Sequence, residues 1–142
     1  MQDLHALDRF LQAQAAVYEG ALAELKAGRK HGHWMWFIFP QLRALGHSEN
    51  ARYYGIASRA EARAYAEHEL LCARLKECTS AVLAVENKTA HEIFGTPDDL
   101  KFRSSITLFA EFAPEASVFR TALDRFFEGV RDVRTMELLE RS

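Results

Sequence analysis

Apolar residues recur every three or four positions over most of the chain, which is the spacing of one face of an α-helix. The first such stretch runs from Asp3 to Ala27 and carries Leu4, Leu7, Phe10, Leu11, Val17, Tyr18, Leu22 and Leu25. Asp3 is the expected N-cap, and Gly28 is the expected end, because glycine readily adopts the left-handed conformation that follows many helices. Residues 12–16 include no large side chain, so a break in the helix is allowed there.

Ser58 and Thr89 mark two further helix starts, because each is followed three residues later by a glutamate. This is the sequence form of a capping box, in which the hydroxyl and the carboxylate satisfy backbone donors of the first turn. Between them, a continuous apolar stripe predicts one long helix through Leu71, Leu75, Cys78, Val82 and Val85. Short helices starting at Ser48 and Thr89 are expected to end at Gly55 and Gly95.

The C-terminal third of the chain predicts three more helices. Thr96 is a cap, Pro97 suits the first helical position and two acidic residues follow, which together predict a helix reaching Phe112. Pro114 opens the next helix, which ends at Gly129, and a last, weaker helix covers 133–139.

Residues 31–41 form the densest aromatic stretch of the chain, with the sequence HGHWMWFIFPQ. Periodicity does not distinguish helix from strand here, but nothing else alternates at period two, and a lone strand would leave its backbone donors unpaired. We therefore expect a short helix, a turn at Pro40 and a second helical piece through Leu45, closed by Gly46. The whole chain, 1–142, is thus predicted to be one compact all-α domain of about seven or eight helices.

The composition agrees with a single folded domain. The 142 residues are 49% hydrophobic, 11% aromatic and 27% charged, which supplies one core, so disorder is not expected. A formal net charge of -2 provides no basic field for nucleic acid, so no nucleic-acid partner is predicted, and it does not oppose a monomer. Cys72 and Cys78 lie on one predicted helix, too far apart for a disulfide and without metal-site spacing, so both are expected to be free, with Cys78 in the core.

Several classes of function lack their usual sequence signals. The first residues carry no basic and apolar leader and no apolar run is long enough to span a bilayer, which predicts a cytoplasmic protein with no membrane partner. The histidines are scattered, and neither an HExxH motif, a Cys–His cluster nor a glycine-rich phosphate loop occurs. No metal and no cofactor are therefore predicted.

Lys101, Ser104 and Ser105 share one face of the helix predicted after Thr96, because residues three and four apart lie above one another. An ammonium group and two hydroxyls in this arrangement can hold a phosphate or a carboxylate. A solvated helix face is the alternative interpretation. A Ser–Lys nucleophile pair is a third, although spacing alone does not bring the hydroxyl to the amine.

The aromatic stretch supplies the other candidate residues, His33, Trp34, Trp36 and Gln41. Imidazole and indole groups there can form a pocket wall on which an aromatic ligand stacks. Alternatively, both tryptophans are core or half-buried packing, because large aromatics dominate the core of a small domain, and Gln41 caps a turn.

Two hypotheses of different classes follow. In the first, the chain binds a small anionic or nucleotide-like ligand, with hydrolase activity left open. Lys101 then binds the anion, the two serines donate hydrogen bonds, His33 donates or relays a proton, and the tryptophans stack on the ligand. In the second, the chain is a protein-interaction or structural module, and the last helix offers a partner surface with Met136, Leu138 and Leu139. Whether the protein is an enzyme is undecided by the sequence.

Several segments together carry a resemblance to a known family: residues 33–42 (HWMWFIFPQL), Tyr54-Gly55-Ile56, Glu61-Ala62, Ile93-Phe94-Gly95, Asp98 through Lys101, Ser104-Ser105 and Thr107-Leu108-Phe109. In these segments the chain resembles a bacterial family, the domain of unknown function 1810, sometimes labelled calpastatin. The resemblance runs from the Phe10 to Gln14 region to about Phe127. It implies a compact, mostly helical, bacterial cytoplasmic protein and no established reaction. The calpastatin label implies no mechanism, because true calpastatin inhibitory segments look like disordered chains.

A fainter likeness rests on Lys101-Phe102-Arg103 and the aromatic stretch. It is to a helical family of N-glycosidases that act on ADP-ribose or phosphoribosyl compounds. The chain lacks a clear match to that family's other site residues, so the likeness implies no activity here.

Overall fold

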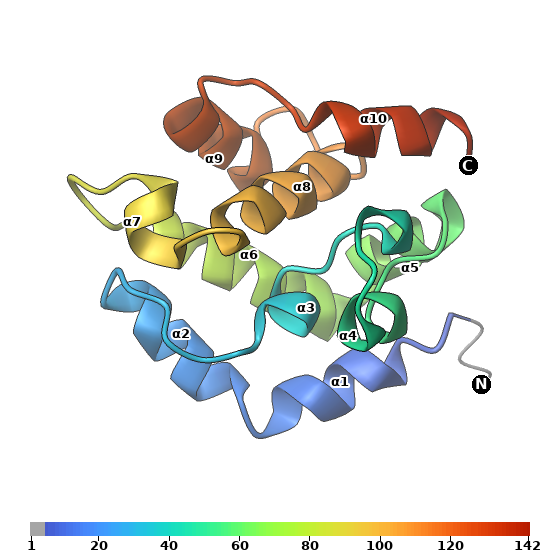
Figure 1. The fold of residues 1–142 in the computed structure, drawn as a ribbon, viewed down its shortest axis with the longest axis horizontal. Coiled ribbons are helices and arrows are strands. Elements are labelled where there is room, and N and C mark those ends of the chain that lie inside the picture. Colours follow the sequence, from blue (N-terminus) through green and yellow to red (C-terminus); the bar gives the residue numbers. More distant parts are fainter. Residues whose placement is uncertain (1–4) are drawn as a thin grey trace.

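The structure, a computed structural model, describes residues 5–142 (Figure 1). Within that range the chain forms ten α-helices and one 3₁₀ helix, and its only β contact is an isolated parallel bridge between Leu42 and Ile56. In chain order the elements are α1 Asp8–Ala15, α2 Tyr18–Lys26, α3 Met35–Ile38, η1 Arg43–Leu45, α4 Glu49–Tyr53, α5 Arg59–Glu67, α6 Glu69–Leu83, α7 Ala90–Phe94, α8 Asp98–Ala110, α9 Val118–Phe127 and α10 Val133–Glu140. The all-α prediction is confirmed, with more helices than expected because the first predicted stretch divides into α1 and α2 and His68 separates α5 from α6.

The break allowed near the start of the chain is present. α1 ends at Ala15 and α2 begins at Tyr18, so the two helices follow the lower edge of the molecule in Figure 1 as separate segments. α1 packs against α3, and α2 packs against α6. The expected N-cap Asp3 lies outside the described residues.

Hydroxyl caps begin several helices as predicted. Ser48 and Thr89 each accept a hydrogen bond from the backbone N–H three residues later, and Thr89 forms the full capping box with Glu92. Ser58 also caps α5, but the carboxylate of Glu61 does not return to the Ser58 N–H and bonds elsewhere. The long apolar stripe lies in α6, where Cys78 is buried and, like Cys72, a free thiol.

Two helix starts differ from the prediction. α8 has Pro97 rather than Thr96 as its N-cap, because the Thr96 hydroxyl bonds to the side chains of His91 and Asp99. α9 begins at Val118 with Ser117 as its cap, because the Ser117 N–H first closes a turn onto the carbonyl of Pro114.

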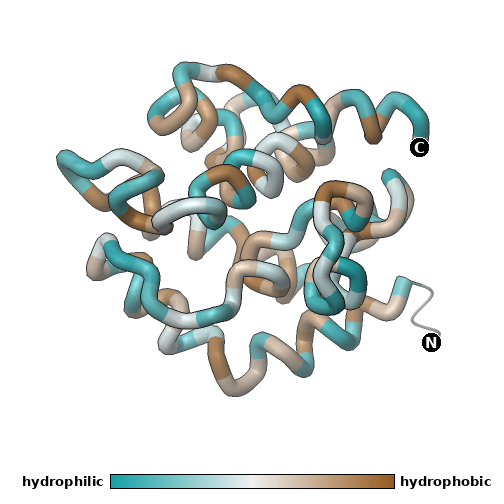
Figure 2. The backbone as a smooth tube through the Cα atoms, in the orientation of Figure 1, coloured by the Kyte–Doolittle hydropathy of each residue, from teal (hydrophilic) through white to brown (hydrophobic). Residues whose placement is uncertain are grey.

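α8 is the central helix of the fold. It contacts α5, α7, α9 and α10, and residues 104–110 are all buried. In Figure 1, α9 and α10 lie above α8, whereas α1 and α2 lie below it. Figure 2 shows hydrophobic and hydrophilic residues alternating along most of the outer helices, as expected when only one face of each helix meets the core.

Aromatic rings connect the aromatic stretch to α8. Phe39 lies edge-on to Phe102 and to Phe94, with ring centroids 5.1 and 5.9 Å apart. Phe94 and Phe102 stack at 4.7 Å, and Phe102 also contacts Phe126 and Phe127 of α9. One aromatic cluster therefore joins the segment after α3 to α7, α8 and α9.

Candidate functional site

Two lysines from different parts of the chain converge on one carboxylate at the start of α8. Lys30, in the loop after α2, places its Nζ 2.7 Å from Asp98 Oδ2, and Lys101 places its Nζ 3.9 Å from Asp98 Oδ1. The side chain of Lys30 is 7% exposed, whereas that of Lys101 is 25% exposed. Asp98 is therefore held mainly by Lys30, and the charge of Lys101 stays accessible from solvent.

Each of these lysines lies over one of the two tryptophans. Lys30 Nζ is 5.0 Å from the centre of the Trp34 ring, and Lys101 Nζ is 5.0 Å from the centre of the Trp36 ring. A cation at such a distance from an aromatic face is attracted by the ring quadrupole. The aromatic stretch and the Lys101 face thus meet, and we call Trp36, Gln41, Asp98 and Lys101 the α3–α8 site.

The loop before α3 is held by Glu24 of α2. Glu24 Oε1 accepts hydrogen bonds from the N–H groups of His31 and Gly32 at 2.6 and 2.8 Å, and from Trp34 Nε1 at 3.1 Å. Burial acts to raise the pKa of Glu24, but these three hydrogen bonds and the charge of His31 outweigh it and hold the pKa below its ordinary value. Trp34 is 2% exposed, so its indole is part of the core.

The indole N–H of half-buried Trp36 has no hydrogen-bond partner among the described residues. Trp36 and Gln41 line a cavity of about 10 Å³ beside α4, together with Tyr54 and Gly55. A space of this size holds about one water molecule. Because a buried donor without a partner costs free energy, this N–H is ready to donate to a water or a ligand atom.

The two serines are buried inside α8, so a solvated helix face is the wrong interpretation for them. Ser104 Oγ donates to the carbonyl of Leu100 at 3.1 Å, as serines within helices often do. Ser105 is fully buried, and its hydroxyl has no partner in the described part of the chain. Within that part, neither hydroxyl bonds to Lys101, because the helices packed around α8 enclose both serines.

The sequence-predicted residues therefore lie in different environments. Trp36, Gln41 and Lys101 belong to the α3–α8 site, and Trp34 supports it from the core. His33 is exposed, and the two serines are enclosed within α8.

Sequence reasoning missed the three charged residues that organise this region, Glu24, Lys30 and Asp98. A lysine after a helix and an aspartate in a first turn already have a sufficient explanation in the helix dipole, so neither pattern indicates a longer-range pair. One signal was present in the sequence. Lys30 directly precedes the aromatic stretch, and Asp98 lies three residues before Lys101.

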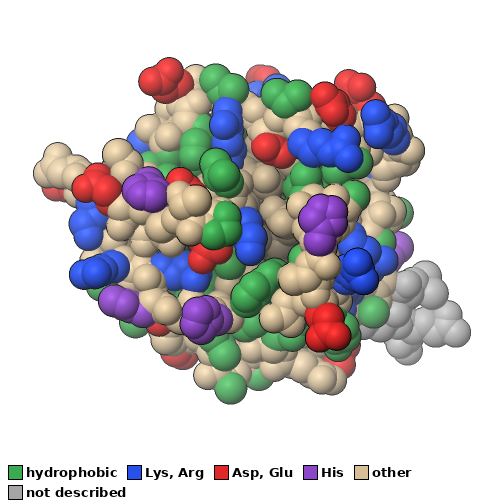
Figure 3. All heavy atoms as spheres, in the orientation of Figure 1, with side chains coloured by type: hydrophobic (Ala, Val, Ile, Leu, Met, Phe, Trp, Pro, Cys, Tyr) green, Lys and Arg blue, Asp and Glu red, His purple; other side chains and the backbone are tan. Residues whose placement is uncertain are grey.

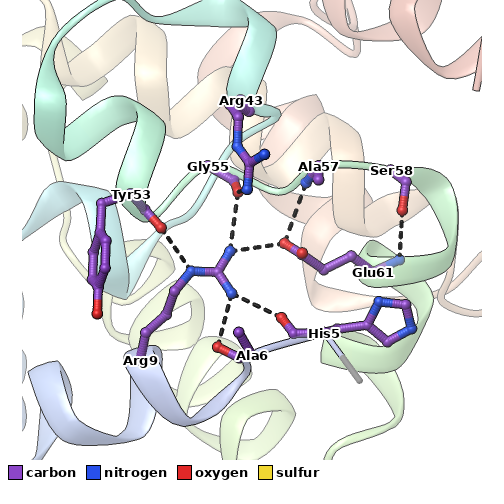
Figure 4. A network of polar contacts seen from close by, with 9 residues as sticks. All are labelled: His5, Ala6, Arg9, Arg43, Tyr53, Gly55, Ala57, Ser58 and Glu61. Carbon is purple, nitrogen blue, oxygen red and sulfur yellow. Dashed lines mark hydrogen bonds and ion pairs between the residues drawn. The ribbon is translucent and has the colours of Figure 1, made fainter. Parts of the chain in front are cut away.

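A second polar cluster, the Arg9 clasp, was also not expected. The side chain of Arg9 uses all five of its N–H donors, and Figure 4 shows the bonds converging on one guanidinium. Nε donates to Tyr53 O at 2.7 Å, and Nη2 donates to Gly55 O at 3.0 Å and to Glu61 Oε2 at 2.9 Å. Nη1 donates to the carbonyls of His5 and Ala6 at 2.9 and 2.8 Å. The clasp therefore ties α1 to the end of α4, to Gly55 in the following loop and to α5.

Within residues 5–142, no group of three or more His, Cys, Asp or Glu side chains is placed to hold a metal ion. None of the helices there combines the length and the apolar character needed to cross a membrane. Figure 3 shows basic, acidic and histidine side chains intermixed over the face that it draws.

Fold and site together define a small all-α domain in which an aromatic segment packs against a buried central helix. Near the start of that helix, a lysine lies over a tryptophan of the segment. The family described as "Protein of unknown function (DUF1810)" matches residues 4–139. The chain belongs to this DUF1810 family, which confirms the resemblance noted in the sequence.

Among solved structures, the chain is similar to the crystal structure of the conserved hypothetical protein Rv1873 from Mycobacterium tuberculosis. The two share 51% sequence identity with a TM-score of 0.95, over 97% of this chain and 99% of that chain. The fold is therefore shared along nearly the full length of both chains. No curated protein matches the chain.

Proposed function

We propose that the protein binds a small anionic, nucleotide-like ligand at the α3–α8 site, with Lys101 as the cation and Trp36 as the stacking surface. The observation that carries this proposal is the position of Lys101 Nζ, 5.0 Å from the centre of the Trp36 ring and partly exposed. A positive charge and a flat apolar face then lie within the span of one small ligand. Phosphate groups and aromatic rings are recognised by such groups.

The charge balance of the site supports an anionic ligand. Lys30 neutralises Asp98 at 2.7 Å, whereas Lys101 stands 3.9 Å from the same carboxylate. One positive charge is therefore in excess among these three side chains. Lys101 also lies near the N-terminal end of α8, where the helix dipole favours negative charge.

The other candidate residues receive separate roles in this proposal. The indole N–H of Trp36 and the amide of Gln41 line the cavity of about 10 Å³ and supply hydrogen bonds there. His33 is exposed and is not among the residues of the α3–α8 site, so its role as a proton donor or relay stays a prediction from the sequence. We assign the two serines to the packing of α8 rather than to the ligand, because both are buried.

Hydrolysis of such a ligand remains a prediction from the sequence. The Ser104 hydroxyl is already engaged with the carbonyl of Leu100, so the proposal does not use it as a nucleophile. What the site supports is recognition of an anion beside an aromatic face.

The alternative of a protein-interaction module has less support. Leu139 is 1% exposed, and Met136 and Leu138 pack against the core. Most of the apolar side of α10 therefore packs within the fold, although Val133 of the same helix is 67% exposed.

A thermal-shift screen against nucleotides and phosphorylated sugars tests the ligand proposal, because a ligand that binds only the native state raises the melting temperature. We expect at least one compound to do so, and Lys101→Met to weaken its binding about tenfold, equivalent to roughly 1.4 kcal/mol. Trp36→Leu should weaken it as well. Lys76→Met is the control, because Lys76 is an exposed lysine on α6.

Urea unfolding of each variant verifies that the fold is intact. The proposal fails if no phosphorylated compound raises the melting temperature of the wild type. It also fails if Lys101→Met binds the selected compound as tightly as Lys76→Met does.

A further inference from the structure

A cleft of about 500 Å³ lies beside the Arg9 clasp, between the start of α1, η1, α4 and the start of α5. Arg43 of η1 lines it, as do Arg52 and Tyr53 at the end of α4. We propose that this cleft is a second ligand site, which binds a nucleoside phosphate through Arg43 and Arg52. The proposal is independent of the α3–α8 site.

The Arg9–Glu61 pair contributes no free charge to the cleft. The two side chains are 2.9 Å apart and only 8% and 6% exposed. Figure 4 shows the Arg9 guanidinium enclosed by its acceptors, so no donor of Arg9 is left for a ligand. This buried pair lines the cleft without adding a net charge to it.

The free charge of the cleft comes from Arg43 and Arg52, which are both exposed. Within the described part of the chain, neither guanidinium lies within ion-pair distance of a carboxylate. Arg43 makes one long hydrogen bond, from Nη2 to the carbonyl of Gly55 at 3.5 Å. Among residues 5–142, the cleft therefore carries two positive charges that no carboxylate pairs with.

This arrangement of charge indicates a phosphate group. A guanidinium presents its donors as a planar fork that matches the oxygens of a phosphate, and two forks lining one cleft can share a dianion. The volume of the cleft falls in the range of about 300–1,000 Å³ that is typical of small-molecule sites. A nucleotide-sized ligand therefore fits both its charge and its size.

Tyr53 supplies the surface for the base. Its side chain is 59% exposed and lines the cleft. The ring is held edge-on against Tyr54, with centroids 4.8 Å apart and planes 86° apart. An exposed aromatic ring that lines the same cleft as two guanidinium groups can stack on a nucleobase while the phosphate binds to the arginines.

α4 separates this cleft from the α3–α8 site. Ala51 and Tyr54 line the small cavity beside Trp36, whereas Arg52 and Tyr53 line the basic cleft. A substitution in one site therefore leaves the lining of the other unchanged, and the two proposals can be tested separately.

Calorimetric titration of the full chain at low ionic strength tests the inference, with AMP, adenosine and inorganic phosphate as probes. We expect AMP to bind, inorganic phosphate to compete with it, and adenosine not to bind. The double variant Arg43→Gln/Arg52→Gln should bind AMP at least about tenfold more weakly. Lys26→Gln/Arg134→Gln is the matched control, because it removes two positive charges from exposed positions elsewhere.

The same titrations in a Lys101→Met background, which removes the cation of the α3–α8 site, separate the two sites. AMP should still bind there, and Arg43→Gln/Arg52→Gln should again weaken its binding at least about tenfold. The inference is overturned if the Arg43/Arg52 variant binds AMP as the control does, or if adenosine binds as tightly as AMP. Loss of AMP binding in Lys101→Met alone would overturn it too and would support the other site. If the double variant does not fold, Arg52→Gln alone carries the test, because Arg52 is exposed and at the end of a short helix.

Discussion

Gly32 shows how one missing side chain shapes the region around the α3–α8 site. A Cβ atom at this position would lie 2.7 Å from Cδ1 of Trp34, closer than real contacts allow. Trp34 cannot move aside easily, because it is 2% exposed and bonded to Glu24. The loop before α3 therefore needs glycine for space.

Gly32→Ala is expected to destabilise the protein by about 1–3 kcal/mol through overpacking. Gly20 is the matched control, because it lies in α2 and a Cβ there would meet nothing within 4 Å. Gly20→Ala should stabilise the protein by about 0.5–1 kcal/mol, because alanine favours the helix. Urea unfolding measures both, and equal effects of the two substitutions would contradict the steric argument.

At the scale of residues, the sequence predicted one meeting of side chains but did not predict how deeply their neighbours are buried. Lys101 and Trp36 do meet, as the first hypothesis required. Ser104 and Ser105 share the helix face of Lys101, yet both are buried. Small hydroxyls are compatible with either environment, so the polar pattern of one helix does not tell whether neighbouring helices cover it.

At the scale of elements, helix starts with a local cause were predictable, and starts that depend on distant groups were not. The capping box at Thr89 is closed within four residues and is present as predicted. The carboxylate of Glu61 leaves the same motif at Ser58 to bond with Arg9, 52 positions away in sequence. The short helices α3 and α4 lie in segments that were predicted to be helical. The additional helices arise where the first predicted stretch divides into α1 and α2 and where His68 separates α5 from α6.

Glu24 joins α2 to the loop before α3, and its role should be visible in the pH dependence of stability. Its pKa is lowered in the folded state, so its stabilising contribution is present above its ordinary pKa near 4.5 and is lost as the pH falls through the folded value. The wild type should therefore exceed Glu24→Gln in unfolding free energy at neutral pH. That difference should shrink as the solution is acidified below this value.

Urea unfolding of both proteins between neutral and acidic pH measures the difference. A difference that stays constant with pH would show that Glu24 acts through shape alone and not through its charge. A difference that grows on acidification would contradict the direction of the pKa shift.

At the scale of the whole molecule, α8 and the aromatic cluster couple the two ends of the chain. Phe102 contacts Phe39 from the segment after α3 as well as Phe126 and Phe127 from α9. α10 also packs on α8. A helix enclosed in this way cannot keep its packing if the helices on one side detach.

We therefore expect a single cooperative unfolding transition with the same midpoint by tryptophan fluorescence and by far-UV circular dichroism. Both tryptophans belong to the α3 segment, so fluorescence reports on that segment alone. Leu139→Ala in α10 should cost about 2–5 kcal/mol and shift both midpoints together, because Leu139 is 1% exposed. Leu70→Ala, at a side chain that is 44% exposed, is the control. Two separate midpoints in the Leu139 variant would contradict the coupling.

The central position of α8 was beyond sequence reasoning for a physical reason. Periodicity shows that a helix has an apolar face, but the partners of that face are set by contacts between residues far apart in the chain. From the sequence, Phe39 and Phe102 are both expected in the core, but nothing in the sequence indicates that they contact each other. The class of fold was therefore predictable, whereas the enclosure of α8 and the meeting of Lys30 with Asp98 were not.

The Arg9 clasp limits the sequences that this fold can accept. Its acceptors belong to three separate stretches of the chain, at residues 5–6, 53–55 and 61. The planar guanidinium has five donors and reaches all of these acceptors. Lysine would bring the same charge with three donors on a single atom, so some carbonyl oxygens would lose their hydrogen bond. The shape of the Arg9 guanidinium, and not only its charge, thus holds α1 against α4 and α5. A lysine at this position would keep the charge but not these contacts.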